Sequence, residues 1–363
     1  MVLRLAIRDS IDKIDEAQWN ACAGEDVLLQ HAFFRTLEHS GAVGRGRTIL
    51  PQYVLLLDDG GNLQACAPAM LKAGTLVEYG PECRWLRAGL AEGCFSWPKF
   101  QVGLPLYAVR GPRLMVRPGA ESGKLRALLI DSMKQLAVQH YERSAFNLMH
   151  IEGSLAQQLE SEGWLISHEI HSFWHNDGWR DFPDYLDSLP HRKRYLILNE
   201  RQKTANLGLD FRFFSGEEIT PALLAAYYAG HQEVCERHGN RPWLPADTLQ
   251  RQVEEMPEAI RLIAAFSGDQ YVAGAIWIVA GDTLILRTWS AFQELPGLCF
   301  ELICHRPVIY AIENGLKSID SGLHGAHKRL RGFADERVFN AHWFADEKLR
   351  QLATRVLAVV PPV

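Results

Sequence analysis

Two histidines and three cationic side chains gather in one glycine-rich segment near the C-terminal end of the chain. The segment runs from Ser321 to Phe333 and reads SGLHGAHKRLRGF. A histidine can accept a proton from an incoming ammonium near neutral pH, and a lysine can bind an anion or stabilise an oxyanion. His327 and Lys328 are therefore candidate catalytic residues, with His324 and Arg331 as candidate ligands of a substrate. A tight turn with a solvated basic rim has the same residue types, so this pattern alone leaves both interpretations open.

A second candidate catalytic residue, Glu301, precedes this segment in an apolar run. A carboxylate among leucine, phenylalanine and isoleucine side chains is costly unless it is paired. His305 follows one helical turn later, so Glu301 is expected to act as a base, to orient His327, or to form a surface (i, i+4) pair worth a few tenths of a kcal/mol. Pro307 removes a backbone donor and is expected to kink this helix near Ile303.

Two further places have the residue types of a binding site. Arg287 and Trp289 are two residues apart, which puts them on one face of a predicted strand. That face either lines a cleft with Arg287 on an anionic group, or is half exposed with an extended arginine. Arg192 and Lys193 begin the densest basic run of the chain. This run is expected to bind phosphates of CoA, tRNA or a lipid headgroup, or to form a solvated helix end.

Composition excludes several classes of protein. The chain has 363 residues, a net charge of −5 and a pI near 6.3, so it lacks the charge of a general DNA-binding protein. Its seven cysteines form no C-x-x-C pair and no set with zinc-site spacing. We therefore expect reduced thiols, no metal site and a cytoplasmic protein, since no apolar run reaches transmembrane length.

The order of predicted elements repeats along the chain. Each half starts with a strand and helices, continues with a hairpin, and ends with a strand, a helix and further strands. The first hairpin surrounds Asp58–Gly61 and the second surrounds Ser267–Asp269. The sequence thus predicts an α/β protein with mixed sheets and two similar domains, residues 1–178 and 179–363.

Several motifs together resemble the FemAB-like, GNAT-related family of bacterial peptidoglycan biosynthesis/recognition proteins. The resemblance covers nearly the whole chain and is strongest from Phe173 to Trp343. The residues that carry it are Phe173-Trp174-His175-Asn176, Arg192-Lys193-Arg194, Arg287 with Trp289, Gly322, Gly325, His327-Lys328 and Arg331-Gly332-Phe333. Leu323 and Ala326 stand where the family pattern has glutamine and glutamate, which indicates a specialised branch.

The resemblance implies two tandem GNAT-like domains and transfer of an acyl or aminoacyl group to an amine. Acyl-CoA is the expected co-substrate, with no permanently bound cofactor. One alternative is a ceramide-synthase-like transfer of a fatty acyl group to a sphingoid base, with peripheral contact at the inner membrane. A second is an aminoacyl-tRNA-dependent transfer to a peptidoglycan-type amine, and a third is a binding protein without turnover. Arg117 and Gly119 precede a helix and are similar to a GNAT pyrophosphate loop, although their spacing differs from the usual motif.

Overall fold

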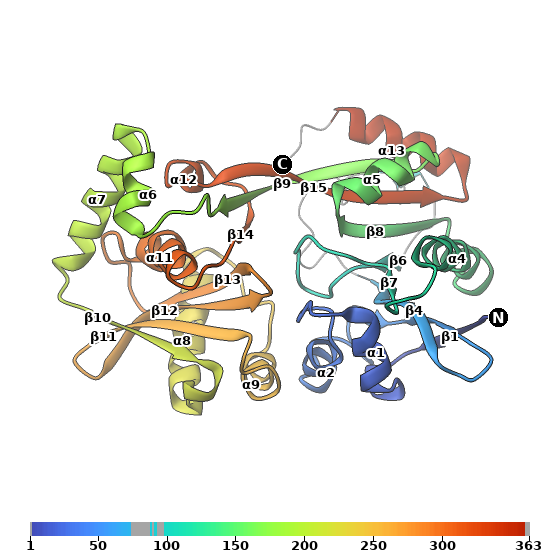
Figure 1. The fold of residues 1–363 in the computed structure, drawn as a ribbon, viewed down its shortest axis with the longest axis horizontal. Coiled ribbons are helices and arrows are strands. Elements are labelled where there is room, and N and C mark those ends of the chain that lie inside the picture. The colour runs from blue at the N-terminus through green and yellow to red at the C-terminus, as the bar shows by residue number, and fades with distance from the viewer. Residues whose placement is uncertain (1, 74–87, 89–90, 93–97, 360–363) are drawn as a thin grey trace. The chain divides into compact units, whose positions relative to one another are not determined.

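A computed structural model describes residues 2–73, 88, 91–92 and 98–359 of the chain. The chain forms two compact units (Figure 1). Unit 1 contains residues 1–170 and 337–363, and unit 2 contains residues 171–336. The strands β9 (Leu165–His175) and β15 (Ala334–Phe344) carry the chain from one unit to the other. Much of the connection between residues 79 and 101, together with Cys83 and Cys94, lies outside the described residues.

Unit 1 contains two sheets. One has the strand order β1-β3-β4-β7, and the strands of the other follow the order β15-β8-β6-β5-β2. Its elements are β1 (Arg4–Arg8), η1 (Ile11–Lys13), α1 (Glu16–Ala23), α2 (His31–His39), β2 (Ile49–Pro51), β3 (Tyr53–Leu57), β4 (Leu63–Ala67), β5 (Ala69–Lys72), β6 (Lys99–Val102), β7 (Met115–Val116), α4 (Ser122–Gln135), η2 (Leu136–His140), β8 (Ala145–Ile151), α5 (Gly153–Ser161) and α13 (Glu347–Val359). The apolar face of α4 packs into a core shared with strands of both sheets.

Unit 2 is built on one sheet of order β10-β11-β12-β13-β14-β9. Its elements are α6 (Phe182–Ser188), α7 (His191–Ala205), β10 (Asp210–Ser215), η3 (Gly216–Glu218), α8 (Pro221–Arg237), α9 (Ala246–Glu255), β11 (Ile260–Ser267), β12 (Gln270–Ala280), β13 (Thr283–Ala291), α10 (Leu298–Phe300), η4 (Glu301–His305), α11 (Arg306–Glu313), β14 (Ser318–Leu323) and α12 (Ala326–Arg329). In Figure 1, α8 lies on one side of the strands and α11 on the other. The core of unit 2 therefore fills the space on both faces of this sheet.

Local sequence signals account for the elements near the site. Both predicted hairpins form, as the antiparallel pairs β3–β4 and β11–β12. Thr220 caps α8 by accepting a hydrogen bond from the Leu223 N–H, and Pro221 stands in the first turn, where its missing N–H costs nothing. The predicted helix from 298 to 312 forms in three parts, because residues 301–305 adopt a π-helical turn just before Pro307. A π-turn at this place fits the missing N–H of the proline.

The division of the chain differs from the predicted boundary at residue 178. Strand β15 was expected to complete the second domain, but its residues 339–344 pair with β8 in unit 1. The C-terminal helix α13 also belongs to unit 1, where Leu349, Leu352 and Ala353 are buried against Ala145. A strand exchanges its sheet partner without any change in its own apolar pattern, so the order of elements could not reveal this pairing.

A parallel pair of strands diverges in unit 2 and positions the site. The strands β13 and β14 run parallel and pair only over Thr283–Ile285 and Ser318–Asp320. Beyond this point β13 continues to Ala291 and β14 to Leu323 without further pairing between them in the described chain. Main-chain groups along two diverging edges are suited to bind an extended ligand as an added strand does.

Candidate active site in unit 2

A cavity of about 170 Å³ opens where β13 and β14 diverge. The lining residues come from β12, β13, η4, β14 and α12 and are mainly apolar. They are Ala275, Trp277, Leu286, Arg287, Thr288, Trp289, Ile303, Ser321 and Lys328. A dry apolar cavity of about 150 Å³ in another protein holds a benzene molecule, so this cavity has room for an apolar group of about that size.

The cavity receives consecutive side chains of β13 because this strand bulges. Residue Ile276 of β12 pairs with Thr288, but the next residue Trp277 pairs with Leu286. Arg287 is thus an extra residue, and a bulge of this kind turns side chains away from simple alternation. Arg287 and Trp289 both line the cavity, and the guanidinium of Arg287 lies 5.7 Å from the Trp243 ring centroid.

Lys328 anchors the end of β14. Its Nζ donates hydrogen bonds of 2.5 and 2.6 Å to the carbonyl oxygens of Ser321 and Leu323. These carbonyls lie where the β14–β9 register shifts. Burial lowers the pKa of Lys328, and the nearby Cys304, Asp320 and Asp335 oppose that shift. An ammonium has three donors, so Lys328 holds the strand end and keeps one donor for a group in the cavity.

His327 precedes Lys328 on the short helix α12 and has an exposed side chain. Its ring lies 6.0 Å from the Phe300 ring, centroid to centroid. Partial desolvation lowers the pKa of His327, and the charges of Lys328 and Arg331 add to the shift. The imidazole is therefore neutral near pH 7, as a general base must be. Gly325 permits this ring position, since a Cβ there would lie 2.6 Å from the His327 ring.

Arg331 is engaged by the protein itself. Its Nε donates a 2.9 Å hydrogen bond to Glu200 on α7, and its Nη2 donates to the other carboxylate oxygen. Its Nη1 donates 2.5 Å to the carbonyl of His327, and the guanidinium stacks 3.3 Å from the Phe300 ring centroid. Arg331 therefore ties the turn that carries His327 to α7 and to the end of α10.

Glu200 belongs to this network but was not among the site residues predicted from the sequence. It also accepts a 3.0 Å hydrogen bond from His305 Nε2. Burial alone would raise the pKa of Glu200, but the hydrogen bonds from His305 and Arg331 outweigh burial and hold the pKa below its usual value. The sequence signal for Glu200 was weak, because it lies 131 positions from Arg331 within a helix rich in charge.

Glu301 does not pair with His305. Its carboxylate accepts a 2.8 Å hydrogen bond from Arg306 and lies 3.4 Å from Arg201 Nε, and its side chain is buried. The π-turn moves His305 off the face expected for an (i, i+4) partner. Within the described residues, no hydrogen bond joins Glu301 to His327.

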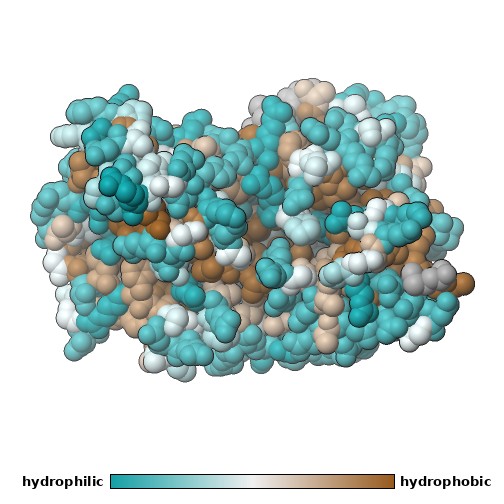
Figure 2. Space-filling model, viewed as in Figure 1, coloured by the Kyte–Doolittle hydropathy of each residue, from teal (hydrophilic) through white to brown (hydrophobic). Residues whose placement is uncertain are grey.

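The remaining candidates are not among the residues that line this cavity. His324 is exposed in the connection between β14 and α12, and Arg192 and Lys193 lie in the first turn of α7. Figure 2 shows a mainly hydrophilic surface over α7. Arg117 and Gly119 belong to unit 1, before α4, where Gly119 has a φ of +82°. Within the described chain, none of the five cysteines there forms a disulfide and no helix is long and apolar enough to cross a bilayer.

Solved structures with the same architecture define the class of this fold. The C-terminal domain of a putative lysylphosphatidylglycerol synthetase from Agrobacterium fabrum aligns with a TM-score of 0.56 at 10% identity, covering 98% of this chain and 100% of that one. FemX aligns with a TM-score of 0.56 at 13% identity, covering 97% and 99%. L-PGS from Bacillus licheniformis aligns with a TM-score of 0.57 at 11% identity, covering 90% and 94%. No curated protein matches the sequence.

These likenesses confirm the predicted fold, a mixed α/β protein of two tandem GNAT-like domains. The sequence of residues 10–359 matches the FemAB-like family, described as peptidoglycan biosynthesis/recognition. The chain belongs to this family, as its motifs predicted.

Proposed function

We propose that unit 2 transfers an acyl group from a thioester such as acyl-CoA to an amine. The observation that carries this proposal is the apolar cavity at the diverging strands, with Lys328 in its wall and His327 next in the chain. The cavity accepts the apolar part of the acyl group. The diverging edges of β13 and β14 suit the extended, amide-bearing arm of the donor.

The chemistry follows from the residues at the cavity. His327, neutral near pH 7, removes a proton from the attacking ammonium. The amine nitrogen then forms a C–N bond to the carbonyl carbon, and Lys328 stabilises the developing oxyanion with its remaining donor. Collapse of the tetrahedral intermediate breaks the C–S bond. The leaving thiolate takes up the second proton of the amine nitrogen, and His327 releases the first to solvent. We assign proton removal to His327 rather than to Glu301, because Arg306 and Arg201 hold the Glu301 carboxylate.

The lining of the cavity distinguishes between two possible pairs of acyl donor and amine acceptor. A fatty-acyl donor and a sphingoid-base acceptor suit its apolar wall, and such a lipid substrate implies work at a membrane surface. An aminoacyl-tRNA donor fits the family description and the cations at the start of α7, the exposed Arg192 and the half-buried Lys193. We favour the acyl thioester, because the described lining residues of the cavity include the cations Arg287 and Lys328 but no carboxylate to pair with the ammonium of an aminoacyl group.

Chain-length selectivity tests this proposal. Purified protein is incubated with acyl-CoA thioesters of increasing length and a panel of amines, and amides are detected by mass spectrometry. Ile303→Phe narrows the cavity and is expected to shift the preferred acyl group to a shorter one, whereas Ile303→Ala shifts it to a longer one. Ile309→Ala, elsewhere in the same core, is the matched control. Unchanged preference in both Ile303 variants refutes the assigned acyl site, and amide formation only from aminoacyl-tRNA favours the other donor.

A further inference from the structure

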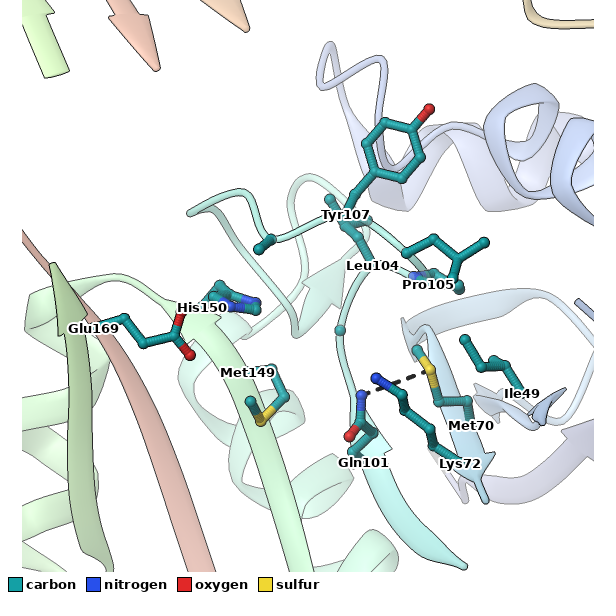
Figure 3. A pocket seen from close by; sticks show the side chains of 13 residues that line it. Ile49, Met70, Lys72, Gln101, Leu104, Pro105, Tyr107, Met149, His150 and Glu169 are labelled. Carbon is teal, nitrogen blue, oxygen red and sulfur yellow. Dashed lines mark hydrogen bonds and ion pairs between the residues drawn. The ribbon is translucent and has the colours of Figure 1, made fainter. Parts of the chain in front are cut away.

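Unit 1 repeats the strand arrangement of the candidate active site. Its strands β6 and β8 are parallel and pair over Phe100–Val102 and Phe146–Leu148. Beyond these residues the chain lines a cavity of about 30 Å³, shown in Figure 3. Segment 103–108, which follows β6, and Met149 and His150, at the end of β8, contribute to this lining. The cavity therefore has the same relation to its parallel strands as the cavity of unit 2 has to β13 and β14.

The lining of the unit 1 cavity is much more polar than that of unit 2. Lys72, Gln101 and Glu169 are 5%, 7% and 3% exposed. His150 Nε2 lies 3.7 Å from Glu169 Oε2. Figure 3 shows His150 and Glu169 on one side of the cavity and Lys72 and Gln101 on the other. Polar and charged side chains gathered at one cavity suit a polar ligand better than an apolar one.

Gln101 identifies the kind of partner that is missing. Its Nε2 donates to the Met70 sulfur at 3.7 Å, but its Oε1 is buried and has no hydrogen-bond partner among the described residues. An amide oxygen only accepts hydrogen bonds. The group that completes the site must therefore bring an O–H or N–H donor to Gln101 Oε1.

The backbone around the cavity is held in an uncommon conformation. Leu106 and His150 have φ values of +64° and +54°, which cost about 1–3 kcal/mol each for residues with a side chain. Asn340 fixes His150, because its Oδ1 accepts from the His150 N–H at 2.8 Å while its Nδ2 donates to Glu169 at 3.3 Å. Backbone in such conformations gathers at ligand sites more than elsewhere.

We propose that the cavity of unit 1 binds the terminal hydroxyl or primary ammonium of a small molecule, with Gln101 Oε1 as its acceptor. The volume admits such a terminus, since one water needs about 10–15 Å³ of the same kind of space. The proposal concerns unit 1 and holds whether or not unit 2 transfers acyl groups. The alternative is a cavity that holds ordered water only.

Saturation-transfer NMR on the full chain tests the proposal with three probes. 1-Propanol and n-propylammonium share the propyl chain but differ in the donor group and its charge, and tetramethylammonium has charge without any donor. We expect saturation of at least one of the first two, no saturation of the third, and at least about a tenfold weaker affinity in Gln101→Met. Gln158→Met, on the exposed face of α5, is the matched control.

A second variant keeps the test decisive if Gln101→Met does not fold. Ala108→Leu places a larger side chain at the cavity wall and is expected to abolish binding of the same probes. No saturation of any probe in the wild-type protein, or equal saturation in both variants, overturns the proposal and leaves a cavity that holds water only. The probe with the higher affinity identifies hydroxyl or ammonium as the natural donor.

Discussion

Removal of the Glu200 carboxylate breaks the buried network that joins α7 to Arg331 and His305 in unit 2. Glu200→Ala leaves Arg331 and His305 without their shared partner, and all three residues are largely buried. Breaking a buried ion pair by removing one partner costs about 3–5 kcal/mol, because the other charge stays desolvated. We expect a loss of this size in the unfolding free energy of unit 2.

Urea denaturation followed by tryptophan fluorescence measures this loss, and a double variant without either charge tests its cause. Glu200→Leu with Arg331→Met removes both charges and is expected to recover a large part of the stability lost in Glu200→Ala. Lys203→Ala, an exposed position on the same helix, is the matched control and should change stability by less than about 0.5 kcal/mol.

The pH dependence of this effect has a definite sign. The pKa of Glu200 is lower in the folded protein than its ordinary value of 4.5, so the pair stabilises the fold above pH 4.5 and this contribution is lost as the pH falls through the folded pKa. The stability gap between wild type and Glu200→Gln should therefore narrow below pH 4.5. A loss under about 1 kcal/mol in Glu200→Ala at pH 7 would refute the positioning role of this network.

Three further outcomes follow from the same geometry. The rate of acyl transfer should fall as the pH is lowered, with an apparent pKa below 6.5, because protonation of His327 removes the general base. If the residual activity of His327→Ala shows the same fall at low pH, His327 is not the base. Lys328→Met should lower kcat about a hundredfold or more, with Lys328→Arg partly active in a steady-state assay, and equal kcat in both excludes oxyanion stabilisation. Burial lowers the pKa of His342 to about 3. Between pH 6.5 and about pH 3 the imidazole is therefore protonated in the unfolded chain but not in the folded protein. The free energy of unfolding should fall by about 1.4 kcal/mol for each unit by which the pH is lowered in this range. Calorimetric proton uptake on unfolding at pH 5 measures this linkage, and uptake that is unchanged in His342→Gln would contradict it.

The sequence predicted those parts of the fold that local signals specify. The two hairpins and the helix after β13 have turn or apolar patterns within a few residues of themselves. The pairing of β15 with β8 has no such signal, because it joins residues almost 200 positions apart. The short helix α12 was also missed, since Ala326–Arg329 is a single turn within a glycine-rich segment.

The candidate site was predicted in its residue types but not in its pairings. Arg287, Trp289 and Lys328 were expected at a ligand site, and all three line one cavity. The partners of Arg331 and Glu301 were not predictable, because the π-turn changes which residues share a helix face and Glu200 lies on a different helix. Backbone irregularities of this kind depend on tertiary packing, which a single sequence does not reveal.

We propose that α12 carries the residues that perform acyl transfer. Mass spectrometry of amide formation from an acyl-CoA and an amine, in wild type, His327→Ala and His324→Ala, tests it most directly. Both histidines are exposed and three positions apart, but we assign chemistry only to His327. We predict that His324→Ala retains activity within about twofold while His327→Ala loses about a hundredfold or more. Equal activity in all three proteins would contradict the account.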